Sequence, residues 1–160
     1  MVLLFHATFG AIWGVFIHNV YFAFILGFAT HYLLDKLPHW EYDVKDLKKF
    51  TFKGIFTDLS KLILDFTLGI VLVLFFNNHP DSLKYTIAGA AGGLAPDFFL
   101  FVSLLLIAIK SNGPFGKSAK IFYSHHLNNH FNITKKTPIW IGALSCAVVL
   151  VSSLLILRLL

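Results

Sequence analysis

The chain has little charge and almost no cysteine. Charged residues make up 13% of its 160 residues, whereas a water-soluble domain carries about 25%. Hydrophobic residues reach 57% and the mean hydropathy is +0.75. These values exclude an ordinary soluble fold and indicate an integral membrane protein. The single cysteine, Cys146, can form no disulfide within the chain. Cysteine usage therefore does not indicate whether the protein lies in an oxidising or a reducing compartment.

The sequence also lacks a nucleic-acid-binding signature, despite its formal net charge of +5. The lysines fall between the apolar segments, and no basic face with interleaved aromatic residues lies outside them. No basic region precedes the first apolar run, which His6 and Trp13 interrupt, so we interpret it as a retained helix and not as a signal peptide. The expected partner is membrane lipid, and no binding to nucleic acid is expected.

Five apolar segments have the length of membrane-spanning helices, which need about 17–25 residues. By length the chain is one domain over residues 1–160, and we expect an all-α, polytopic membrane bundle. Pro96 should break or kink the fourth segment, and whether residues 98–109 span, re-enter or lie at the interface is left open. The polar stretch before the third segment should lie on the membrane surface. The expected helices cover about 2–18, 20–37, 59–77, a span from about 83, and 138–157.

The distribution of lysines predicts the orientation. Two long loops, after the second helix and before the last, carry nearly all of them, while the opposite side has only Lys84 and Arg158. Because positive loops stay in the cytoplasm, both long loops and the N-terminus are expected there. The sequence thus predicts a multi-pass membrane protein with a cytoplasmic N-terminus.

Histidine and aspartate side chains from five stretches are expected on the cytoplasmic side. The first three helices have their polar residues near that end, and the rise from Leu83 to Asp97 is roughly 20 Å, which returns Asp97 to the same side. Ionisable groups at such depth are costly and commonly functional. The candidates are His6, His31, Asp35, Asp65, Asp97 and the cluster of His125, His126 and His130.

The spacing of these residues is typical of a metal site. His31 and Asp35 lie four residues apart, so both side chains share one helix face about 5–6 Å apart, and His126 and His130 repeat this spacing. Imidazole and carboxylate groups are ligands of zinc and other hydrolytic metals. We therefore expect a divalent metal, with zinc favoured, as one ion or as two ions bridged by aspartates.

The order of the segments "LFHATFGAIWG", "GFATHYLLDKLPHWEYD", "LDFTLG", "GAAGGLAPDFF" and "HHLNNHF" resembles membrane-bound metal-dependent hydrolases. It is similar to the LexA-regulated inner-membrane hydrolases and more distantly to zinc-dependent phospholipase C. The resemblance implies a bacterial inner membrane and a helical membrane fold with a hydrolytic His/Asp metal centre. Its expected metal ligands are His6, His31, Asp35, Asp97 and His126, and its expected catalytic acid or base residues are Asp65 and His130.

The expected function is hydrolysis of an ester or phosphoester, with a lipid-like or amphiphilic substrate at the cytoplasmic interface. The alternatives are a non-catalytic membrane protein that binds metal or lipid headgroups and a small transporter, although no inverted repeat is evident. Each residue also has a structural alternative. His31 and Asp35 could only hold two helices together, Asp97 could cap a helix, and Asp65 could pair with Lys61.

Overall fold

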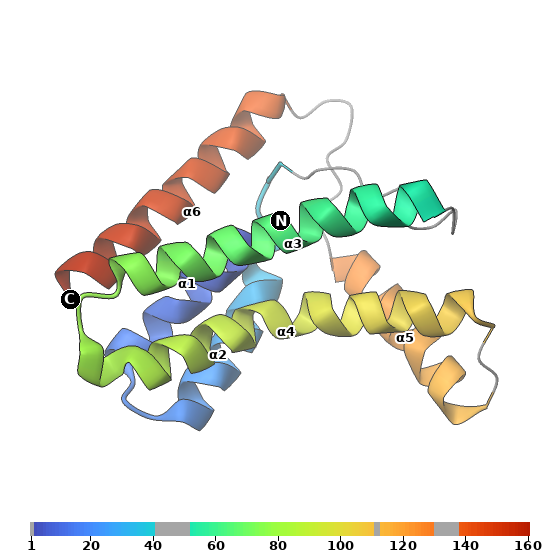
Figure 1. The fold of residues 1–160 in the computed structure, drawn as a ribbon, viewed down its shortest axis with the longest axis horizontal. Coiled ribbons are helices and arrows are strands. Elements are labelled where there is room, and N and C mark those ends of the chain that lie inside the picture. Colours follow the sequence, from blue (N-terminus) through green and yellow to red (C-terminus); the bar gives the residue numbers. More distant parts are fainter. Residues whose placement is uncertain (1, 41–51, 111–112, 130–137) are drawn as a thin grey trace.

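The computed structural model describes residues 2–40, 52–110, 113–129 and 138–160. Within these ranges the chain is helical and contains no strand, which confirms the expected all-α bundle. Figure 1 shows the elements along the chain. They are α1 (Leu3–Phe16), α2 (Val20–Leu34), α3 (Phe52–Phe76), the 3₁₀ turn η2 (Pro80–Ser82), α4 (Leu83–Ala108), α5 (Pro114–Asn129) and α6 (Ile139–Leu159).

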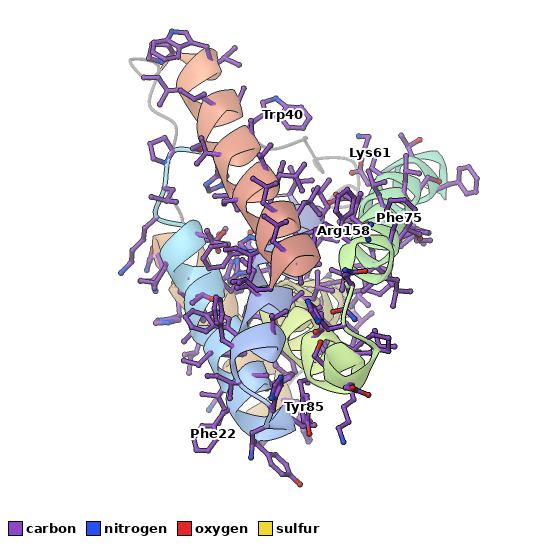
Figure 2. The ribbon with its side chains drawn as sticks, turned by 90° about the vertical axis from the view of Figure 1, so that its left-hand side faces the viewer. Phe22, Trp40, Lys61, Phe75, Tyr85 and Arg158 are labelled. Atoms are coloured by element: carbon purple, nitrogen blue, oxygen red, sulfur yellow. The ribbon has the colours of Figure 1, made fainter. Side chains whose placement is uncertain are left out.

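Three helices are long and apolar enough to cross a membrane. The apolar stretches are Gly54–Phe76, Pro80–Ile107 and Ile139–Leu159. Helices α1 and α2 are apolar but shorter than expected, with 14 and 15 residues. The outer surface carries exposed aromatic side chains such as Phe22 and Phe75 (Figure 2). Such a surface on long apolar helices indicates a membrane protein.

Helix α4 is the centre of the bundle, and α1 and α2 pack closely against its N-terminal half. A Cβ atom at Gly93 would lie 2.2 Å from the carbonyl oxygen of His6, and one at Gly27 would lie 2.2 Å from that of Gly89. Only glycine allows the backbones to approach so closely. The small residues of the "AGAAGG" segment therefore permit close helix packing.

The sequence predicted a break or a kink at Pro96, and the structure shows no break in α4. The helix continues without interruption from Leu83 to Ala108, so residues 98–108 extend it beyond Asp97. Proline removes the hydrogen bond to the carbonyl of Gly92 and crowds it. However, Pro96 is fully buried, and both halves of α4 pack against other helices. This packing outweighs the local cost of the proline.

A turn after α4 sends α5 back along the C-terminal half of α4 (Figure 1). The turn includes two residues in the left-handed region, Lys110 with φ 51° and Gly113 with φ 89°. Pro114 then occupies the first position of α5, where its missing N–H is tolerated. The returning helix brings His126 to the level of Asp97. The expected surface segment lies mostly outside the described residues.

Candidate metal centre

His31 and Asp35 sit at the C-terminal end of α2. His31 is in the last turn, and Asp35 is the C-cap residue, whose backbone N–H donates to the carbonyl of His31. The helical spacing places both side chains on one face, with 3.0 Å between His31 Nε2 and Asp35 Oδ2. The short stretch "HYLLD" thus forms one half of the site by local geometry alone.

Three other helices deliver a side chain to this pair. His6 of α1 places Nε2 3.2 Å from Asp35 Oδ1. Asp97 of α4 places Oδ1 3.8 Å from His31 Nε2. His126 of α5 places Nε2 3.7 Å from Asp97 Oδ1 and 3.8 Å from Asp35 Oδ2. We call His6, His31, Asp35, Asp97 and His126 the His/Asp centre.

The His/Asp centre is buried, with one open side. The side chains of His6, His31, Asp35 and His126 are at most 2% exposed, whereas that of Asp97 is 21% exposed. Buried charges are costly unless they are paired or bind a metal. Any exchange with the surroundings is therefore expected along the side of Asp97.

A backbone contact fixes one hydrogen of His31. Its Nδ1 lies 2.8 Å from the carbonyl oxygen of Gly93, and since a carbonyl oxygen only accepts, Nδ1 must carry a hydrogen. Nε2 then faces Asp35 and Asp97, either with a lone pair in the neutral ring or with a second hydrogen in the charged ring. A backbone carbonyl that orients a histidine in this way is typical of metal ligands.

Asp35 makes two short contacts with imidazole rings. Nε2 of His6 and Nε2 of His31 lie 3.2 and 3.0 Å from its oxygens. Each contact places a ring nitrogen beside a carboxylate oxygen in a buried site. A proton on the nitrogen or a metal ion held between the donors offsets the cost of burying these groups.

The separations between donor atoms fit one tetrahedral ion. Zinc bonds of about 2.0–2.2 Å in tetrahedral geometry place neighbouring ligand atoms about 3.3–3.6 Å apart. Four donor separations among His31, Asp35, Asp97 and His126 are 3.0, 3.8, 3.8 and 3.7 Å, and each lies within about 0.3 Å of that range. These four residues could therefore hold a metal without large side-chain movements.

His6 extends the centre on the other oxygen of Asp35. Its ring stacks on that of His31, with centroids 3.9 Å apart and an angle of 26° between the planes. His6, His31 and Asp35 form one group of potential ligands, and His31, Asp97 and His126 form a second. Because the groups share His31 and meet at Asp35, the arrangement is compatible with one ion or with two.

Two residues beside the site were not expected from the sequence. The first is Gly93, since no sequence signal shows that its carbonyl meets Nδ1 of His31. Tyr32 lies beside the centre, with its ring centroid 5.4 Å from that of His31 and 5.9 Å from that of His126. Its position next to His31 in the sequence could have drawn attention to it.

Other candidates lie apart from the His/Asp centre or outside the described residues. Asp65 accepts hydrogen bonds from the backbone N–H groups of Leu3 and Leu4, at 2.7 and 3.3 Å, and so caps α1. His125 is exposed on α5. His130 lies outside the described residues, so its catalytic role stays a prediction.

The structural roles suggested from the sequence for Asp97 and Asp65 can be compared with the structure. Asp97 lies within α4 and not at its start, so it is no N-cap. Lys61 pairs with Asp58 at 2.9 Å, and its suggested pair with Asp65 stays a prediction. His39 is buried near α6, where a Cβ at Gly142 would lie 2.9 Å from the His39 carbonyl carbon.

Comparison of the chain with protein families, with curated proteins and with solved structures finds no match.

Proposed function

We propose that this protein is a membrane-embedded metal-dependent hydrolase that cleaves an ester or phosphoester of an amphiphilic substrate. The observation that carries the proposal is the convergence of His31, Asp35, Asp97 and His126 from three helices at separations that suit a tetrahedral ion. The resemblance of the sequence to metal-dependent membrane hydrolases supports the same reading.

The residues of the His/Asp centre would have different roles. His31, Asp35, Asp97 and His126 would hold a divalent metal, with zinc favoured by the mixed histidine and carboxylate donors. When bound, such an ion activates water and polarises a carbonyl or phosphoryl oxygen. Asp97 borders the open side, where a substrate would arrive. His130 remains the proposed acid or base.

The location of the protein belongs to the same proposal. The long apolar helices support several crossings of the membrane. The lysine-rich loops support a cytoplasmic N-terminus and a His/Asp centre on the cytoplasmic side of a bacterial inner membrane. A centre that lies among apolar helices favours a substrate that partitions into the bilayer.

A non-catalytic metal site is the second candidate, and the burial of the centre favours it. Four of the five donor side chains are at most 2% exposed. Structural metal sites are closed, whereas catalytic sites keep a position open for water or substrate. In that case the ion would hold α1, α2, α4 and α5 together.

The hydrolase and the non-catalytic metal site differ in whether the protein hydrolyses a substrate. Protein purified in lipid nanodiscs would be stripped with a chelator, reloaded with Zn²⁺, Mn²⁺ or Mg²⁺, and assayed against carboxylic esters, phosphomonoesters and phosphodiesters. We expect metal-dependent hydrolysis that falls at least about 100-fold in Asp97→Asn, as for loss of an active-site group. Thr86→Val, far from the centre, is the matched control.

Each result decides between the candidates. Hydrolysis that requires metal and Asp97 supports the enzyme. Stoichiometric metal without hydrolysis of any ester class leaves the structural metal site. Hydrolysis that persists unchanged in Asp97→Asn or after chelation contradicts the proposed centre.

A further inference from the structure

An apolar groove runs between the C-terminal half of α4 and the returning helix α5. Its volume is about 400 Å³, within the range of about 300–1,000 Å³ that is usual for small-molecule sites. Apart from two serines and Ala119, the lining side chains are large and apolar. They are Phe28, Phe99, Val102, Leu106, Phe115 and Phe122.

One end of the groove meets the His/Asp centre. Phe122 precedes His126 by one turn on α5, so the two side chains share one face of that helix. The ring centroids of Phe122 and His126 lie 6.1 Å apart, as do those of Phe99 and Phe122. The groove therefore begins beside His126, whose Nε2 lies 3.7 Å from Asp97 Oδ1, and continues away from the ionisable residues.

The length and lining of the groove suit an extended hydrocarbon chain. From Phe99 to Leu106 the groove extends about 10 Å along α4 at 1.5 Å per residue. Its lining is almost wholly apolar, and one end meets the polar His/Asp centre. An apolar groove that ends at a polar centre matches an amphiphile, with the chain along the groove and the head at the centre.

We propose that this groove binds the hydrocarbon chain of a single-chain amphiphile whose ester or phosphoester head lies at the His/Asp centre. This inference rests on the proposed function and names its substrate class. The chain lies between Phe99 and Phe122, and the head reaches the open side of the centre at Asp97. Apolar burial binds the chain, and the metal ligands select the polar head.

A second groove on the same molecule offers a matched control. It lies on α6, has a volume of about 380 Å³, and is lined by Ala147, Val148, Val151, Ser152 and Leu155. None of these lining residues is ionisable. Ser118 lines the first groove as Ser152 lines the second. Substitution of either serine by tryptophan fills its groove with an indole ring.

The test compares Ser118→Trp with Ser152→Trp in metal-loaded protein in nanodiscs. The substrates are dodecyl phosphate and methyl phosphate, which share the head and differ in the chain. Each methylene that loses its apolar contacts weakens binding about fourfold, so filling the groove should lower kcat/KM for dodecyl phosphate by about tenfold or more. We expect methyl phosphate hydrolysis to stay unchanged, and Ser152→Trp to alter neither rate.

A photoreactive dodecyl phosphate with a diazirine on the chain provides a readout that does not need turnover. Labelling should map to residues 99–106 and 115–122 and should disappear in Ser118→Trp only. Equal effects on both phosphates, or labelling that survives in Ser118→Trp, would overturn the groove assignment while leaving the hydrolase standing. Correct labelling without hydrolysis of either phosphate, or of the carboxylic esters and phosphodiesters named above, supports the groove and contradicts the proposed function.

Discussion

The two ends of the α1–α2–α4 bundle both bury polar side chains, but they satisfy them differently. At the end near η2, Ser82 donates to the carbonyl of His79 at 2.9 Å, Thr86 donates to the carbonyl of Ser82 at 3.1 Å, and Asn77 donates to that of His79 at 3.1 Å. These groups are neutral and bond within the protein, although the buried Nε2 of His79 at this end has no hydrogen-bond partner among the described residues. The opposite end holds the His/Asp centre, where imidazole and carboxylate groups meet at short distances.

The difference separates a structural polar cluster from a ligand site. Neutral hydroxyl and amide groups close a turn and need nothing further. Buried ionisable groups that face one another need a proton or a metal cation to offset the repulsion and the loss of hydration. We therefore expect substitutions at the η2 end to change stability alone, and substitutions at the centre to change metal binding.

Loss of Asp35 should give the largest effect. Asp35 contacts His6, His31 and His126, so Asp35→Ala removes the carboxylate that joins both ligand groups. Changes to outer-shell partners lower metal affinity by about 10–100-fold, and loss of this ligand should exceed that range. Isothermal titration of the stripped variant with Zn²⁺ measures the change. Affinity within tenfold of the unsubstituted protein would contradict the assignment of Asp35.

Gly93→Ala should weaken metal binding by moving the backbone carbonyl that orients His31, while every metal ligand is kept. The new Cβ would meet the His6 carbonyl oxygen at 2.2 Å, and the carbonyl that orients His31 would shift. A fall in zinc affinity of about 10–100-fold is expected, as for other outer-shell changes. Gly92→Ala is the matched control, since its Cβ would meet the Phe24 carbonyl at 2.1 Å, away from the centre. If both variants bind zinc equally well, Gly93 acts only in packing.

Thr86→Val tests the η2 end. The buried hydroxyl loses its hydrogen bond to the Ser82 carbonyl, and the cost should be about 1–3 kcal/mol of stability. The apparent melting temperature in nanodiscs should fall, while zinc affinity should stay unchanged. A parallel loss of zinc affinity would show that the two ends are not independent.

Asp65→Asn should give the smallest effect. The amide oxygen can still accept from the Leu3 N–H, but the negative charge at the N-terminus of α1 is lost, which should cost about 0.3–1 kcal/mol. Melting should shift slightly and hydrolysis should continue. Lost hydrolysis with full metal occupancy would instead give Asp65 the acid–base role predicted from the sequence.

The sequence allowed much of the centre to be predicted, because helix geometry relates spacing to position. Four-residue spacing placed His31 and Asp35 together, and a rise of about 1.5 Å per residue brought Asp97 to the same level. The expected helix at 138–157 matches α6 closely. The convergence of His6 with these residues followed from an up-and-down topology.

What the sequence could not show depends on contacts between distant segments. The continuity of α4 through Pro96 depends on packing along both halves of the helix, which no local rule includes. The return of His126 depends on the turn at Lys110 and Gly113. The role of the Gly93 carbonyl depends on the approach of α2 to α4. Asp65 has a suitable residue type, but its neighbour in space is the start of α1.

Metal content is the most direct test of the central claim. Protein purified without chelator and soaked in Zn²⁺ would be washed and analysed by inductively coupled plasma mass spectrometry, beside His31→Ala and Thr86→Val. Four-ligand zinc sites bind tightly, so the unsubstituted protein and Thr86→Val should retain about one or two ions per chain, and a folded His31→Ala should retain almost none. Folded, unsubstituted protein that retains no metal, or retention that is equal in His31→Ala, would contradict the account.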